Sequence, residues 1–145
     1  MWKLLAAVAC VSAASAAPVP KDFKKPDDKT RLVGTWTVTL CNVSGREFPN
    51  PGWESLLIDA DGGIRAVSRE GTTVFEYATV LDPTAAPKRM PFRDTKTAAV
   101  MYECVYQFTA GGLTISIPHD HKQPPASLDP GARATVYEFK RADAK

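Results

Sequence analysis

Apolar and polar side chains alternate one for one along much of this chain, as in strands with one buried and one solvated face. The clearest run is Leu32-Val33-Gly34-Thr35-Trp36-Thr37-Val38-Thr39-Leu40, in which threonines alternate with larger apolar residues. Antiparallel sheets show this pattern because only one of their faces packs against a core. No stretch has sustained helical periodicity. The pattern therefore predicts an all-β domain.

Eight strands are expected in succession, separated by glycine turns and proline-rich connections. Turns such as Asp61-Gly62-Gly63 and Ala110-Gly111-Gly112 are typical of hairpins, because glycine adopts positive φ without penalty. Pro91 lies inside the fifth run and predicts a short, irregular or edge strand, because proline has no N–H to donate. The predicted strands are residues 33–43, 54–59, 63–69, 73–81, 88–93, 98–109, 112–117 and 133–141.

An open sheet of eight strands would leave two edges unpaired. We therefore predict that the first and last strands pair, closing an antiparallel up-and-down eight-stranded barrel. A two-sheet β-sandwich is the alternative, which alternation alone does not exclude. In the last strand, Tyr137 and Phe139 compete with Val136 and Glu138 for the buried face. The other side chains predicted to face inward are Trp36, Val38, Leu40, Leu56, Ile58, Ile64, Ala66, Phe75, Tyr77, Leu81, Met90, Phe92, Tyr106, Phe108, Leu113 and Ile115.

The first 16 residues have the organisation of an export signal. Lys3 precedes a short apolar run, and Ala14-Ser15-Ala16 offers the small-x-small pattern that signal peptidases cleave. This predicts a periplasmic or extracellular protein, with a lipoprotein anchored at Cys10 as the alternative. Residues 17–31 are rich in proline and charge, which predicts a flexible linker. The β-domain is then expected over residues 32–142.

Charge and hydropathy exclude two classes of partner. The formal net charge of +2 falls to +1 when Lys3 is removed with the signal, and no basic stripe is present. The sequence therefore gives no reason to expect nucleic acid as a partner. No segment has the roughly 20 apolar residues that a membrane-spanning helix needs.

Two cysteines, Cys41 and Cys104, remain after cleavage and invite a disulfide in an exported protein. Alternation places Cys41 with the outward threonines, whereas Cys104 shares the inward face of Tyr102 and Tyr106. Opposite faces disfavour a bridge unless a β-bulge intervenes, because the two side chains must converge.

Several blocks resemble the lipocalin-like paralogous domain family of Planctomycetales. The resemblance spans about residues 31–141, and its most specific element is Asp82-Pro83-Thr84-Ala85-Ala86-Pro87-Lys88. It implies an exported lipocalin-like β-barrel and no particular activity, since none is established for the family. The other blocks are residues 32–38, 105–108, 111–115 and 136–141.

Two of these blocks also have a physical interpretation. Trp36 is expected to fill one end of the barrel, while Gly34 lets a neighbouring group approach closely. Asp82, Pro83 and Pro87 are expected to form a rigid corner, because aspartate caps turns and proline presets φ. Both are structural roles.

The histidines are the main candidates for metal chemistry. His119 and His121 flank Asp120, and in an extended chain both imidazoles lie on one side and could reach one zinc or copper ion. No third ligand at a defined spacing is evident. There is also no Gly-x-Ser-x-Gly elbow and no phosphate-binding glycine loop. We therefore expect no cofactor and no enzymatic activity, with a metal-dependent enzyme at these histidines as the least favoured hypothesis.

The barrel interior is the remaining candidate site. Its expected aromatic lining suits a small apolar ligand, although a packed core, the commoner case, uses the same residues. The leading hypothesis is an exported lipocalin-like binding module for a small apolar molecule. The alternative is a protein-binding inhibitor or envelope accessory domain that uses loops 44–53 and 118–132. The candidate ligand-binding residues are Trp36, Phe75, Tyr77, Tyr106 and Phe108.

Overall fold

The computed structural model describes residues 26–121, 123–129, 131 and 133–142. Over these residues the chain is almost entirely β, with one short helix at its start. All eight predicted strands are present, and a two-residue strand, β2, is an addition. The elements are α1 (Asp28–Leu32), β1 (Gly34–Val43), β2 (Arg46–Glu47), β3 (Ser55–Ile58), β4 (Gly63–Val67), β5 (Thr73–Ala78), β6 (Lys88–Arg93), β7 (Val100–Thr109), β8 (Gly112–Pro118) and β9 (Ala134–Arg141).

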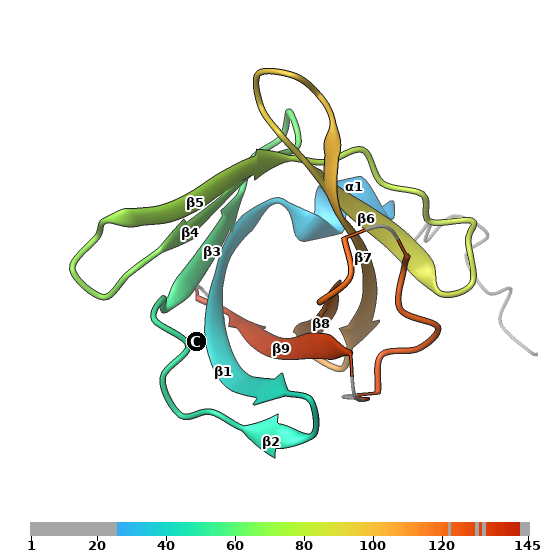
Figure 1. Cartoon of the computed structure of the whole chain (residues 1–145). Coiled ribbons are helices and arrows are strands. Elements are labelled where there is room, and N and C mark those ends of the chain that lie inside the picture. Colours follow the sequence, from blue (N-terminus) through green and yellow to red (C-terminus); the bar gives the residue numbers. More distant parts are fainter. Residues whose placement is uncertain (1–25, 122, 130, 132, 143–145) are drawn as a thin grey trace, which may run out of the picture.

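The strands form one antiparallel sheet that closes into a ring (Figure 1). From β3 to β9 each strand pairs with the next one in the sequence, and β2 is attached to the end of β1. The ring closes because β1 also pairs with β9 over most of its length, from Trp36↔Arg141 to Val43↔Thr135. The predicted pairing of the first and last strands is therefore confirmed. The sheet is continuous, so the two-sheet alternative is not observed.

The pairing of β5 with β6 is thin, and Pro91 explains why. The pairs Ala78↔Arg93 and Asp82↔Arg89 share one register, which places Pro91 opposite Val80 at a hydrogen-bonding position. Proline has no N–H to donate there. On its other side β6 pairs with β7 along its whole length. The predicted irregularity at Pro91 is therefore a local gap in pairing within the ring, not a free sheet edge.

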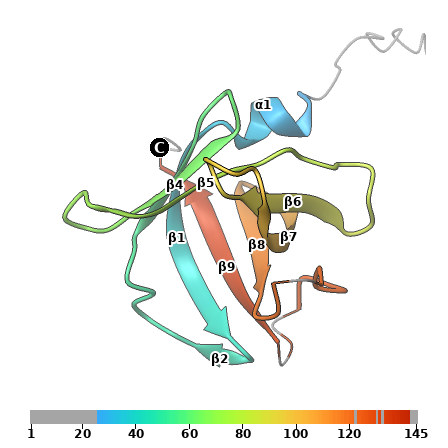
Figure 2. The same ribbon diagram turned by 45° about the horizontal axis from the view of Figure 1, so that its top comes forward.

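Helix α1 lies across one end of the ring, which we call the closed end (Figure 2). At the opposite, open end, β1 runs into β2 and β9 begins. Asp27 caps the helix by accepting a hydrogen bond from the Thr30 N–H. Leu32 is buried at 2% exposure. The helix begins inside the segment 17–31 that was expected to be a flexible linker, so the folded domain starts at Asp28 or earlier.

Asp28 attaches α1 to the ring. Its Oδ2 accepts hydrogen bonds from Lys88 Nζ at 2.6 Å and from the Tyr106 hydroxyl at 2.8 Å. Burial works against the ionised carboxylate, but these donors prevail and hold the pKa of Asp28 below its ordinary value. The carboxylate therefore stabilises the closed end while it is ionised.

We expect Asp28→Asn to lower the free energy of unfolding by about 1–3 kcal/mol at neutral pH, because the two donors lose a charged acceptor. Since the folded-state pKa is depressed, the contribution of Asp28 is present above its ordinary titration range near pH 4 and is lost as pH falls through the folded value. Urea unfolding at several pH values measures this. The wild-type advantage over Asp28→Asn should shrink in acid, and an advantage independent of pH would contradict the assignment.

The core fills the closed half of the ring. Trp36 lies there at 4% exposure, and its Nε1 donates to the Leu32 carbonyl at 2.8 Å. The guanidinium of Arg141 lies 4.9 Å from the Trp36 ring. Gly34 has a φ of +136°, and a Cβ there would approach Arg141 Nη1 to 3.1 Å. The expected positions of Trp36, as an end plug, and of Gly34, at a close approach, thus agree with the structure.

A β-bulge at Thr39 reverses the alternation in the second half of β1. The register moves from Val38↔Phe139 to Leu40↔Glu138, and one additional residue flips every later side chain to the opposite face. Leu40 therefore faces outward and Cys41 faces inward, the reverse of the sequence prediction.

The last strand follows the alternative pattern. Tyr137 and Phe139 belong to the core, whereas Glu138 is exposed. Val136 is buried, but it lies on the outer face of β9, where it pairs with Ser116 of β8. Of the two pairs that the sequence left open for the inward face, the structure has Tyr137 and Phe139 there, and Glu138 does not face inward.

Cys41 and Cys104 are both buried free thiols. Both face inward, so opposite faces are not the reason that no bridge forms. The row Cys41↔Tyr137↔Ile115↔Tyr106 crosses from β1 to β7 in three strand spacings, roughly 14 Å along the sheet. The two thiols therefore lie on strands that are not neighbours in the sheet, and both are free.

We expect both thiols to resist alkylation in the native protein. Burial raises the pKa of Cys104 far above its usual value, and burial also raises that of Cys41, where Tyr137 opposes the shift. The thiolate is the reactive form, so reaction with iodoacetamide at neutral pH should be slow until the protein unfolds. Peptide mass spectrometry measures the labelling with and without denaturant. Rapid native labelling of Cys104 would contradict the described core.

The turn at Asp82 has the form expected for a rigid corner. Asp82 Oδ1 accepts hydrogen bonds from the backbone N–H and the hydroxyl of Thr84, and from the Ala85 N–H. These donors hold the pKa of Asp82 below its ordinary value, with the Thr84 hydroxyl as the largest cause. The hydrogen bonds support a structural role for the Asp82-Pro83 block.

No helix within the described residues is long and apolar enough to cross a membrane. The predicted export signal, residues 1–16, and the alternative lipid anchor, Cys10, lie outside the described residues.

Candidate functional site

A cavity of about 420 Å³ occupies the open end of the ring. We call it the open-end cavity. Side chains from β5 to β9 and from the start of the β8–β9 connection form its walls. Five of them are aromatic, and two histidines lie at its rim. The lining residues are Phe75, Tyr77, Phe92, Tyr102, Ile117, Pro118, His119, His121, Thr135 and Tyr137.

One wall of the cavity is a set of touching rings from β5, β6 and β7. The Tyr77 ring is 5.4 Å from that of Phe75 and 5.6 Å from that of Phe92, between centroids. Tyr77 and Phe92 are close to parallel at 25°, whereas Tyr102 stands at 74° to Tyr77, with centroids 5.9 Å apart. Strand alternation turns all four rings inward, and the neighbouring strands bring them together.

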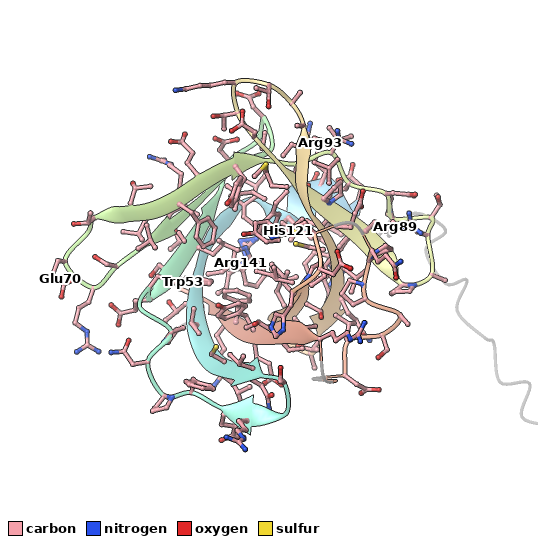
Figure 3. All side chains as sticks on the ribbon, in the orientation of Figure 1. Trp53, Glu70, Arg89, Arg93, His121 and Arg141 are labelled. Carbon is pink, nitrogen blue, oxygen red and sulfur yellow. The ribbon has the colours of Figure 1, made fainter. Side chains whose placement is uncertain are left out.

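Tyr137 of β9 closes the cavity from another side. Trp53, from the segment before β3, packs against it with a centroid distance of 4.8 Å, and also lies 5.5 Å from Phe75 (Figure 3 labels Trp53). Burial and the neighbouring Cys41 raise the pKa of Tyr137 to about 12. Burial and Tyr102 raise the pKa of Tyr77. Both phenols therefore remain protonated at neutral pH and can act as hydrogen-bond donors.

His121 and His119 make the rim polar. His121 Nδ1 donates to the Met101 carbonyl at 3.0 Å, and its ring lies 4.6 Å from that of Tyr102. In Figure 3 His121 projects over the opening of the ring. His119 Nε2 is hydrogen-bonded to Thr135 Oγ1 at 3.0 Å. A ligand entering the cavity would pass these imidazoles before it reaches the aromatic wall.

The histidine metal hypothesis gains no additional ligand from the fold. Among the residues that the structure describes, no group of three or more His, Cys, Asp and Glu side chains is placed to hold a metal ion. One nitrogen of each ring is also engaged in the hydrogen bonds given above. Metal binding by His119 and His121 therefore stays a prediction from sequence.

Two of the five predicted ligand-binding residues, Phe75 and Tyr77, line the open-end cavity. Trp36 and Tyr106 are instead buried in the filled closed half. Phe108 lies under the Arg31 guanidinium, 3.7 Å from its ring centroid. Alternation identifies the inward face of a strand but not the depth of a residue along the ring. Sequence reasoning therefore did not assign Phe92, Tyr102, Ile117 and Tyr137 to the site, although it placed Phe92 and Tyr102 on inward faces.

The closed half is packed around Trp36 and Tyr106, with a hollow of about 390 Å³ beside α1 that Leu32 and Ile58 help to line, and the open half holds the aromatic-lined cavity. The sequence favoured a filled interior, whereas the structure has packed side chains in the closed half and a cavity in the open half. Helix α1 bounds the closed half, and the polar rim bounds the open-end cavity.

Another hollow, of about 430 Å³, is bounded by β1 and the segment from Phe48 to Glu54. We call it the outer groove. Phe48 is 48% exposed there. Arg69, Glu70 and Glu54 also line it, so it is more polar than the open-end cavity.

No protein-family model, curated protein or solved structure matches the chain. The function must therefore be argued from the geometry of the site, together with the sequence resemblance described above.

Proposed function

We propose that the ring is a lipocalin-like, up-and-down β-barrel of eight strands, and that the protein is a non-enzymatic binding module. Its ligand is a small apolar molecule held in the open-end cavity. The observation that carries this proposal is the contrast between a filled closed half and an aromatic-lined hollow at the open half.

The size and lining of the open-end cavity support this assignment. Its volume of about 420 Å³ falls within the roughly 300–1,000 Å³ of ordinary ligand sites. Its wall is aromatic and aliphatic, with a few polar groups at the rim, which is the usual composition of such sites. Among the described residues of the lining, the titratable side chains are the two rim histidines and three tyrosines, and none is a carboxylate, lysine or cysteine.

Export is part of the same proposal and rests on the sequence of residues 1–16. A periplasmic or extracellular barrel of this kind would carry a poorly soluble molecule through water or sequester it. The partner is then the ligand itself, and no bound cofactor is required.

A fluorescence titration with N-phenyl-1-naphthylamine, a neutral apolar dye, tests this function. We expect a saturable, one-site increase in dye fluorescence with folded protein, and none with protein unfolded in urea. The absence of a saturable increase with folded protein would contradict the proposal.

A protein-binding role is the second candidate, and exposed Phe48 favours it. An apolar ring at the mouth of the outer groove is the kind of group that anchors a partner. A photo-crosslinking amino acid at position 48 should then capture one specific exported protein, whereas the same amino acid at exposed Val74, on β5, should not. Equal labelling from the two positions would contradict this role.

A further inference from the structure

We propose that the open-end cavity prefers ligands that carry a positively charged, methylated nitrogen over neutral ligands of the same shape. This inference rests on the proposed function, because it assigns a ligand class to the same cavity. It makes a separate claim about charge, which a matched pair of probes can test.

The first argument is the absence of formal charge in the wall. Among the residues that the structure describes, the ten that line the cavity include no Asp, Glu, Lys or Arg. A carboxylate ligand would meet no lysine or arginine among these residues, and only neutral donors such as the phenols would replace its hydration. A trialkylated ammonium has no N–H to satisfy, and its charge can be stabilised by the faces of aromatic rings. The wall therefore disfavours anions more than it disfavours such cations.

The second argument is the arrangement of the rings. Tyr77 and Tyr102 stand at 74°, so they form two walls of a corner, and Phe92 extends the Tyr77 wall at 25°. Tyr137 comes from β9, on another side of the same cavity. Rings at a large angle to each other, with a further ring from another strand of the lining, can contact a compact group on more than one side. Cages that bind quaternary ammonium groups are built in this way.

Negative charge near the cavity also favours a cationic ligand. Burial and Tyr102 are the main causes that raise the pKa of Tyr77, and the carboxylate of Asp94 contributes in the same direction. Asp120 lies between the two rim histidines in the sequence. Arg93 follows Phe92 but does not line the cavity, and its Nη1 donates to the Ala98 carbonyl. A negative charge near the Tyr77 wall would favour a cation in the cavity.

Choline and 3,3-dimethylbutan-1-ol test the inference directly, because they have the same shape and differ in the central nitrogen or carbon. Each is measured by displacement of N-phenyl-1-naphthylamine at about pH 8, above the ordinary titration range of imidazole. We expect choline to bind between about twofold and thirtyfold more tightly than the alcohol, as cation–π contacts imply. Equal affinities, or tighter binding of the alcohol, would overturn the inference.

Two substitutions at Tyr102 test whether its ring causes the preference for choline over the alcohol. Tyr102→Leu removes a ring and should reduce the ratio of the two affinities towards one, whereas Tyr102→Phe keeps the ring and should preserve the ratio. Tyr77→Leu is the second ring-removing variant if Tyr102→Leu does not fold. If the ratio of the two affinities does not change when a ring is removed, the aromatic rings do not cause the preference.

Binding of the dye distinguishes a failure of this inference from a failure of the proposed function. If the dye binds the wild type but choline has no advantage over the alcohol, the charge preference is wrong and the apolar binding module stands. If the dye itself does not bind, both are wrong.

Discussion

Replacing Trp36 with alanine is expected to lower the free energy of unfolding by about 3–5 kcal/mol. The indole is buried in the closed half of the ring, and its Nε1 donates to the Leu32 carbonyl, so its loss leaves both a void and an unpaired carbonyl. The Arg141 guanidinium would also lose the ring that it covers. Equilibrium unfolding in urea measures the change.

Two variants control for this effect. Trp36→Phe keeps an aromatic ring but removes the donor, so its loss should be smaller than that of alanine. Val80→Ala changes a side chain that is 70% exposed and should be near neutral. A loss below about 1 kcal/mol for Trp36→Ala would contradict a filled closed end.

The variant Thr135→Trp should weaken binding of N-phenyl-1-naphthylamine at least about tenfold, which corresponds to about 1.4 kcal/mol. Thr135 lines the open-end cavity on β9, beside the rim, and an indole at this position would occupy part of the space proposed for the ligand. The substitution also removes the hydroxyl that is bonded to His119. A fluorescence titration gives the affinity directly.

Thr73→Trp is the matched control, because Thr73 is exposed on β5 and does not line the cavity. It adds the same side chain and should leave dye affinity unchanged. Unfolding curves establish that both variants fold. If Thr135→Trp is folded and binds dye as the wild type does, the dye occupies another site.

The strands could be predicted from sequence because each one obeys a local rule. Alternation identified all eight, and the threonine-rich run from Gly34 onward pairs with the last strand as expected. The bulge at Thr39 could not be predicted in this way. It is a one-residue shift in the pairing of β1 with the distant strand β9, and it reversed the assignments of Leu40 and Cys41.

Helix α1 was missed for a different reason. Its sequence, Asp28–Leu32, is short and charged, and by itself resembles a linker. The groups that bind it are distant along the chain, since Asp28 is hydrogen-bonded to Lys88 and Tyr106, which lie 60 and 78 residues away. Local patterns contain no signal for such contacts.

The sequence predicted an aromatic site inside the ring of strands, but not which aromatic side chains line it. An aromatic interior was expected, and Phe75 and Tyr77 are part of the cavity wall. Which rings surround open space depends on the stagger of the strands around the ring, which places Tyr106 deep and Tyr102 near the rim. Stagger follows from the register of all the ladders together, so no single segment encodes it.

The most direct test of the account is a crystal structure of the protein soaked with 1-bromonaphthalene, with bromine located by its anomalous signal. The account predicts a bromine peak within the open-end cavity, between the rings of Phe92 and Tyr137. A peak only in the outer groove beside Phe48, or no peak in crystals in which side chains fill the open end, would contradict it.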